Sequence, residues 1–298
     1  MLTNLLYAGG MIRKHALPIL LTLAVLGGCN PAPAARLADI DRALSERRYA
    51  DARTALLALR QHDANSIETV RRLAKVELAL EDGYAAERYL DEWRRITGET
   101  PEWTTLRARA LILEGRSRFA RDVLERAAPA EQEAEQRAWL RVWALMEEGK
   151  FEKAEETVMT ALDRYPRSPN LHGRAGRLMA MLGEWEAVNQ HVSEALAVDP
   201  QHYESLMLLG ESRIAEGNLE GALEPYRTAA RVYPEFAMPP VNVVSLLIDL
   251  NRLDEARRVL KPALARHPRF PLLRFMSARL DAASKRWAQA RMTLQALP

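Results

Sequence analysis

The 298-residue chain is long enough for two domains of ordinary size and is almost neutral, with 42 Lys+Arg against 40 Asp+Glu. The first 28 residues hold two of the basic residues and no acidic one, so the remainder carries 40 of each. A nucleic-acid-binding protein normally shows a clear basic excess or stripe, so this balance argues against a nucleic-acid partner. The single cysteine excludes an internal disulfide framework.

An apolar segment near the N-terminus has the features of a secretory signal. Arg13 and Lys14 supply its basic start, residues 16–26 are mostly apolar, and two glycines directly precede Cys29. Eleven residues are too few to cross a bilayer as a helix, which needs about 20. The segment is therefore predicted to be removed rather than to span a membrane.

The end of this segment, Leu26-Gly27-Gly28-Cys29, resembles the bacterial lipobox. The resemblance implies that Cys29 is lipidated and becomes the mature N-terminus. Acyl chains would then anchor the protein to a membrane, at about 0.8 kcal/mol per buried methylene. The alternative is a plain signal peptide with a chance cysteine. The lipobox is favoured because the sole cysteine falls where the pair of small residues requires it.

The predicted signal peptide covers residues 1–28, and Met11 is an alternative start because it would open a signal of ordinary length. Residues 29–35 then form a short Pro/Ala tether. In bacterial lipoproteins an aspartate after the cysteine usually signals retention at the inner membrane. Asn30 follows the cysteine here, so the resemblance implies the outer membrane, at its periplasmic face.

A 34-residue period runs through the rest of the chain. Seven alanines and one valine keep this step: Ala52, Ala86, Ala120, Ala154, Val188, Ala222, Ala256 and Ala290. Apolar or aromatic residues keep it at Leu56, Leu90, Leu124, Val158, Val192, Tyr226, Leu260 and Leu294. Glycines recur at Gly115, Gly149, Gly183 and Gly217, where Asn251 continues the series, and prolines recur at Pro166, Pro200, Pro234 and Pro268. Apolar positions three and four apart predict two amphipathic helices per period, with a turn at the glycine and an end at the proline.

This pattern resembles the tetratricopeptide repeat (TPR), most closely in residues 173–200 and 208–234. The resemblance covers residues 36–298 and implies an all-α, right-handed superhelix (an α-solenoid) of about eight helix-turn-helix repeats. The expected units are residues 33–66, 67–100, 101–134, 135–168, 169–202, 203–236, 237–270 and 271–298. Units one to three lack the closing proline, and Gly83 lies two places after the usual turn position of unit two.

Two features depart from this pattern. Pro225 and Pro262 fall inside second helices, where each removes a hydrogen bond and is expected to kink its helix. No polar closing helix follows the eighth unit in the sequence, although terminal repeats normally need one. Leu294 and Leu297 are therefore expected either to stay partly exposed or to meet another surface.

The sequence contains no recognisable catalytic constellation. It lacks a Gly-rich phosphate loop, a G-x-S-x-G and an H-E-x-x-H. His172, His191 and His202 are the densest histidines, and the first two lie on opposite helices of one unit, so a shared metal is conceivable. Zinc sites, however, usually have three or four ligands at tighter spacing. We expect no enzyme activity, no cofactor and no metal site.

In TPR proteins the exposed face of each first helix usually contacts the ligand. Carried over by register, this concave wall comprises Arg71, Lys75, Arg109, Trp139, Trp143, Arg177, Glu211, Asn242, Phe275 and Arg279. Trp139 and Trp143 are one helical turn apart and share a face, so the set predicts a basic groove with an aromatic anchor. The alternatives are an ordinary solvated face for the cations and packing between repeats for the two tryptophans.

Some TPR domains hold a partner's C-terminal carboxylate with lysines and asparagines on this wall. Arg71 and Lys75 stand where Lys and Asn would, and later units do not complete the pattern, so a chaperone-tail clamp is not expected. The resemblance implies a non-catalytic scaffold for a protein partner in a bacterial envelope machine, such as pilus assembly, exopolysaccharide export or secretion. The alternatives are a glycan- or peptidoglycan-associated factor and a homo-oligomer formed through the eighth repeat.

Overall fold

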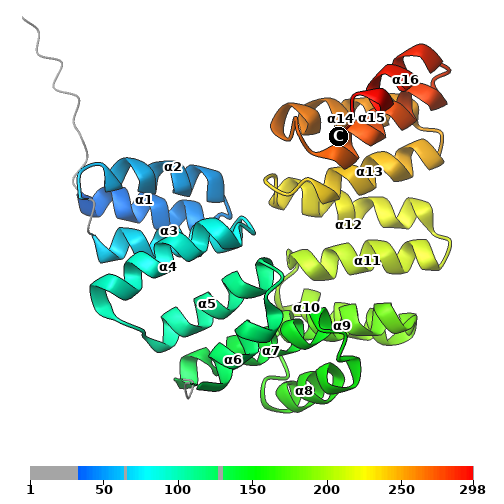
Figure 1. Cartoon of the computed structure of the whole chain (residues 1–298). Helices are drawn as coiled ribbons and strands as arrows, with labels where there is room; N and C mark the ends of the chain where they lie inside the picture. Colours follow the sequence, from blue (N-terminus) through cyan, green and yellow to red (C-terminus); the bar gives the residue numbers. More distant parts are fainter. Residues whose placement is uncertain (1–32, 64–65, 127–129, 298) are drawn as a thin grey trace, which may run out of the picture.

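A computed structural model describes residues 33–63, 66–126 and 130–297, and these residues form a superhelix of α-helical pairs (Figure 1). No strand occurs among them. The all-α solenoid expected from the sequence is therefore confirmed.

The helices follow one another as first and second helices of successive repeats. The first four pairs are α1 (Pro33–Ser45) with α2 (Tyr49–Arg60), α3 (Ile67–Ala79) with α4 (Gly83–Thr97), α5 (Pro101–Leu113) with α6 (Ser117–Arg126), and α7 (Ala134–Glu147) with α8 (Phe151–Arg164). The next four pairs are α9 (Pro169–Leu182) with α10 (Trp185–Val198), α11 (Tyr203–Ala215) with α12 (Leu219–Val232), α13 (Met238–Asp249) with α14 (Leu253–Arg266), and α15 (Pro271–Ala283) with α16 (Trp287–Gln295). A short 3-10 helix, η1 (Glu131–Glu133), precedes α7.

The turn inside each pair has a positive φ at a position that recurs every 34 residues. These positions are Arg47, Glu81, Gly115, Gly149, Gly183, Gly217, Asn251 and Lys285. A non-glycine residue in the left-handed region costs about 1–2 kcal/mol, which explains the glycines and the asparagine. Arg47 (φ 58°) and Glu81 (φ 62°) therefore adopt a conformation that their residue types disfavour.

Local signals set where the helices begin and end. Ser66, Thr100 and Ser168 cap α3, α5 and α9, each side-chain oxygen accepting a backbone N–H three residues on. The second helices α8, α10, α12 and α14 end two residues before the recurring prolines Pro166, Pro200, Pro234 and Pro268. Pro225 and Pro262 lie inside α12 and α14, which continue through them as single helices.

The alanine ladder lies in the core, and none of its eight members exposes more than 5% of its surface. Small residues let the two helices of a pair approach closely. At Gly210 on α11, an added Cβ would lie 2.4 Å from Cζ of Tyr226. The Tyr226 side chain is 1% exposed and has little room to move. Gly210 thus makes room for the Tyr226 ring, which stands at a position where all seven other repeats carry leucine or valine.

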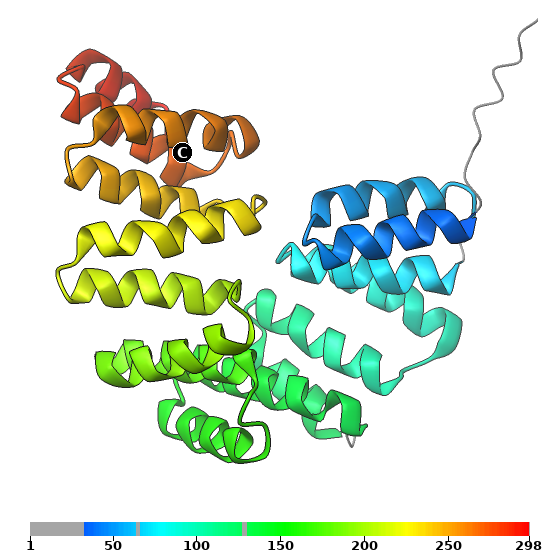
Figure 2. The ribbon, with the colours of Figure 1, turned by 180° about the vertical axis from the view of Figure 1, so that it is seen from behind.

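The repeats curve into an open ring. In Figure 1, α1–α4 form one arm and α11–α16 the other, with α5–α10 joining them, and the view from behind in Figure 2 shows the same arrangement. The α1–α2 turn in one arm is hydrogen-bonded to the segments that precede α11 and follow α12 in the other arm. These hydrogen bonds join the first repeat to the fifth and sixth repeats.

We predict that Gly210→Ala destabilises the protein, because overpacking a core costs about 1–3 kcal/mol and exceeds the gain of about 1 kcal/mol from better helix propensity. In a Tyr226→Leu background the clash disappears, so the same Gly210→Ala change becomes neutral or stabilising. Urea unfolding of the four proteins measures this coupling. Additive effects of the two substitutions would show that the helix pair is not closely packed here.

Candidate functional site

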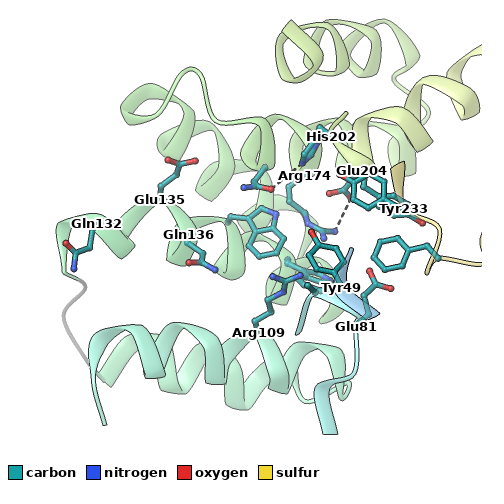
Figure 3. A pocket seen from close by; sticks show the side chains of 16 residues that line it. Tyr49, Glu81, Arg109, Gln132, Glu135, Gln136, Arg174, His202, Glu204 and Tyr233 are labelled. Carbon is teal, nitrogen blue, oxygen red and sulfur yellow. Dashed lines mark hydrogen bonds and ion pairs between the residues drawn. The ribbon is translucent and has the colours of Figure 1, made fainter. Parts of the chain in front are cut away.

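A cavity of about 450 Å³ lies on the inner side of the superhelix and is lined by side chains from the first six repeats (Figure 3). First helices α3, α5, α7, α9 and α11 supply most of its wall, and Tyr49 at the start of α2 reaches it from the opposite arm. The cavity is therefore a product of the whole ring rather than of one repeat.

Two tryptophans and two arginines form the centre of this cavity. Trp139 is only 9% exposed and Trp143 is half-buried, and their ring centroids are 5.4 Å apart. The Arg109 guanidinium lies 5.6 Å from the Trp139 ring, and that of Arg174 lies 5.5 Å from Trp139 and 4.4 Å from Trp143. Two cations thus share one aromatic pair, in contacts that each contribute about 0.5–2 kcal/mol.

The two arginines differ in how their charges are compensated. Arg174 forms an ion pair with Glu204 at 3.2 Å. Arg109 makes neither a hydrogen bond nor an ion pair with any residue that the structure describes. Burial lowers the pKa of both guanidinium groups, although part of each side chain remains accessible to the cavity. A guanidinium stays charged at any physiological pH, so Arg109 brings an unpaired positive charge to the wall.

Glu81 faces this cation group from the α3–α4 turn. Burial raises the pKa of its carboxyl group, and the positive charges of Arg109 and Arg174 oppose that shift without cancelling it. Its carboxylate has no hydrogen bond or ion pair within the described part of the chain. The positive φ of Glu81 is a strained conformation at the edge of a cavity, a combination that often marks a functional residue.

An aromatic cluster and a histidine complete the wall. Tyr203, Tyr233 and Phe236 pack with ring centroids 4.8–5.6 Å apart. Burial lowers the pKa of His202, so its ring is neutral near pH 7, and it contacts Ser205 at 2.8 Å and Asn170 at 3.3 Å. The glycine on α9 at position 173 makes room for this imidazole, since a Cβ there would lie 2.7 Å from its Cε1 atom.

Arg47 closes the ring beside the cavity. Its guanidinium donates to Asp199 Oδ2 at 2.8 Å, to the backbone oxygen of Gln201 at 2.8 Å and to the hydroxyl of Tyr233. The Tyr233 hydroxyl in turn donates to the Gln201 oxygen at 2.8 Å, and burial raises its pKa to about 12, which keeps it protonated. The strained turn at Arg47 therefore places a side chain that holds the two arms together.

The predicted wall residues fall into two groups. Arg109, Trp139 and Trp143 line the central cavity. Most of the others bond to a neighbouring repeat: Arg71 and Lys75 to Glu102, Arg177 to Glu211 and Glu204, and Arg279 to Asp249 and Ser245. Asn242 is half-buried on α13, and Phe275 is 40% exposed on α15. The cations outside the cavity are thus largely neutralised, and the groove is not broadly basic.

Several cavity residues were not identified from the sequence. Arg174 lies one helical turn before Arg177, so its position on the same face could have been recognised from the register. Glu81 occupies the turn position where later repeats have glycine, and the glycine of this repeat is two residues further on, at Gly83. That displacement was the signal in the sequence. Tyr49, Tyr203 and Tyr233 gave no signal, because they meet only through the closure of the ring.

The histidine pair and the membrane-related predictions have separate outcomes. His172 and His191 approach to 3.1 Å between their Nδ1 atoms, but no group of three or more His, Cys, Asp or Glu side chains in the described residues is arranged to hold a metal ion.

Cys29, the signal peptide and most of the tether lie outside the described residues. None of the helices described from residue 33 onward is long and apolar enough to span a bilayer.

Comparisons with known proteins agree with the repeat architecture. Residues 190–235 and 247–298 match family models described as tetratricopeptide repeat. The fold is similar to a chain in the crystal structure of the APC/C hetero-tetramer Cut9-Hcn1, with a TM-score of 0.59 and 13% sequence identity. That match covers 91% of this chain and 57% of the other chain, so this chain spans little more than half the length of the other chain. A comparison with curated proteins finds no match.

These findings show tetratricopeptide repeats in residues 190–235 and 247–298 and a shared fold with the solved structure. Repeats of this family generally serve as non-catalytic scaffolds for protein–protein interaction. A protein partner is therefore the general expectation for such repeats.

We predict that Arg47→Gly opens the ring. Glycine suits the positive φ of the turn, so the change removes the contacts to Asp199, Gln201 and Tyr233 without straining the turn. Hydrogen bonds to charged groups contribute about 1.5–3 kcal/mol each, enough to hold two arms together. Small-angle X-ray scattering should show a larger radius of gyration for Arg47→Gly. Arg48→Ala is the control, since among the described residues the Arg48 side chain bonds to its neighbours Glu46 and Asp51 and not to the other arm. Equal radii for both variants would exclude the closure.

Proposed function

We propose that this protein is a non-catalytic scaffold that holds a protein partner against the concave side of its superhelix. The observation that carries the proposal is the central cavity, which gathers aromatic and charged side chains from six repeats into one concave site. Trp143 and the aromatic cluster of Tyr203, Tyr233 and Phe236 provide apolar surface, and Arg109 provides charge. Partly accessible tryptophan and arginine side chains are the residue types that dominate binding energy in protein interfaces.

The polar groups of the cavity support binding rather than chemistry. Glu204 is paired with Arg174, and His202 is neutral and contacts Ser205 and Asn170. The Ser205 hydroxyl that His202 contacts is fully buried, so it is not accessible to a substrate as a nucleophile. The arrangement orients side chains for recognition.

We further propose that Cys29 is lipidated and tethers this scaffold to the periplasmic face of a bacterial outer membrane. The lipobox-like segment supports this placement. There the scaffold would recruit or stabilise a component of an envelope assembly, such as a pilus, an exopolysaccharide exporter or a secretion system. Because α1 begins at position 33, only a few residues separate it from the anchor, and each residue spans at most about 3.6 Å. The first repeat would therefore lie close to the bilayer surface.

The concave site is tested by affinity capture from detergent-solubilised envelopes. We expect a partner that co-purifies with wild type to be reduced at least tenfold with Trp143→Ala, because truncating an interface tryptophan typically costs about 2–4 kcal/mol. Tyr84→Ala is the control, since Tyr84 is 69% exposed on α4 and does not line the cavity. Circular dichroism confirms that both variants are folded. A partner lost equally with both variants, or with neither, would count against the concave site.

The anchor is tested by changing Cys29→Ser. Wild type is expected to incorporate labelled fatty acid and to sediment with outer membranes, because acyl chains partition into the bilayer. Cys29→Ser should take up no label and leave the membrane fraction. Wild-type protein found unlabelled in the soluble periplasm would contradict the anchor and leave the concave site unaffected.

A further inference from the structure

We propose that a groove between the second helices α12 and α14 binds an acidic amphipathic helix of a protein partner. The groove has a volume of about 500 Å³. First helices supply most of the central cavity, whereas the two walls of this groove come from second helices. Phe236 is the only residue among those described that lines both. The inference therefore goes beyond the concave scaffold site and adds a second interaction surface.

The floor of the groove is apolar. Helix α13 packs against both α12 and α14 (Figure 1), and it contributes Pro240 and Val243. The flanking helices contribute Ala230, Val259 and Ala263. Ala230 and Val259 are only half-buried, so part of this apolar surface is open to a ligand. Covering such surface contributes about 25 cal/mol per Å², which favours a ligand with apolar side chains.

Four arginines border this apolar floor: Arg227 and Arg231 on α12, and Arg258 and Arg266 on α14. No carboxylate lines the groove among the described residues. Glu255, nearby on α14, is paired with Arg227 at 3.3 Å and with Arg252 at 2.6 Å. Hydrogen bonds from Arg252 lower the pKa of Glu255, and the charges of Arg227 and Arg258 lower it further. Arg231 and Arg266 form no ion pair with any described residue, so the groove keeps a net positive charge that an acidic ligand would complement.

The repeat pattern does not require these arginines. In the fourth repeat, the register positions of Arg231 and Arg258 are occupied by Asp163 and Glu156. Both of these side chains are acidic and exposed on α8. The charge of the groove is therefore set by its own residues rather than by the fold.

A groove between the second helices α2 and α4 provides an internal comparison. Arg88 and Arg95 line it, at the register positions that the sixth and seventh repeats also fill with exposed arginines. Asp91 and Glu92 line it as well, and Glu92 is paired with Arg60 at 2.7 Å. Acidic side chains compensate the arginines there, so we expect that groove to leave an acidic ligand unbound.

The arginines lie in two rows along the groove, and this arrangement suits a helix. Arg227 and Arg231 are about one turn apart on α12. Arg258 and Arg266 are about two turns apart on α14, with the exposed Pro262 between them, so that row extends about 12 Å at 1.5 Å per residue. A helix with its apolar face on the floor presents carboxylates on both flanks, one turn apart, opposite these rows. A phospholipid carries its phosphate at one end only and would leave most of the arginines unmatched.

The test is fluorescence anisotropy of a labelled synthetic peptide titrated with the full chain in detergent. The peptide repeats Leu-Ala-Ala-Leu-Glu-Ala-Glu, which places leucine on one helix face and glutamate on both of its flanks. One control peptide has glutamine in place of glutamate, and a second has alanine in place of leucine. We expect saturable binding of the acidic peptide and about tenfold weaker binding of each control, because the groove combines charge with an apolar floor.

The matched variants are Arg231→Glu/Arg258→Glu in the groove and Arg88→Glu/Arg95→Glu on α4, which reverse the same charges at the same register positions. All four arginines are exposed, so both variants should fold, and circular dichroism checks this. The groove variant should bind the acidic peptide about 10- to 100-fold more weakly than wild type, because like charges would then face each other. The α4 variant should bind as wild type does.

Each other outcome overturns the proposal. Equal binding of either control peptide, equal effects of the two double variants, or no saturable binding of the acidic peptide would each exclude this docking site. Soluble dihexanoyl-phosphatidylglycerol that binds the groove in place of the peptide would assign it to a lipid. Self-association of wild type that Arg231→Glu/Arg258→Glu abolishes would assign it to a second copy of this chain. None of these results bears on the concave site, which Trp143→Ala tests separately.

Discussion

Close packing between the two helices of each repeat is the constraint on which the rest of the structure depends. The alanine ladder leaves no member more than 5% exposed, and at Gly210 the helix backbone approaches the Tyr226 ring directly. Because the same contact recurs every 34 residues, each repeat adds a similar rotation to the last. The accumulated curvature brings the first repeat to the fifth and sixth, where Arg47 meets Asp199 and Tyr233. The central cavity lies between the two arms that this contact joins.

The period of the sequence predicted the helices well because each repeat packs mainly against its neighbours. Turn positions, second-helix ends and the buried ladder all follow from spacing, and each is local. The contact between the two arms, in contrast, joins repeats that are not neighbours. Arg47 and Asp199 are 152 residues apart, and although Arg47 occupies the recurring turn position, no periodic signal connects it to Asp199. Tyr49 and Tyr233 reach the cavity through the same closure and were missed for the same reason.

The repeat register predicted which residues lie on the concave wall, but the net charge of that wall depends on which of them form ion pairs. Arg177 and Glu211 are one period apart, and that pair could be read directly from the sequence. Arg109 has Trp143 one period on, which offers no acid. Lys75 is neutralised by Glu102 at an irregular spacing that only the structure reveals. Arginines at one register position therefore form ion pairs between repeats in some units, whereas Arg109 forms none. The difference depends on whether an adjacent helix supplies an acidic side chain.

The turn residues Arg47 and Glu81 have a consequence for attempts to stabilise this fold. Averaging the repeats into a consensus would place glycine at both positions, relieving about 1–2 kcal/mol of backbone strain at each turn. The resulting protein would be a more stable solenoid, but it would lack the side chain that joins the arms and the carboxylate that faces Arg109. In this protein, the turn residues that depart from the repeat pattern are the ones that join the arms and line the cavity. A fully regular array would therefore lack both features.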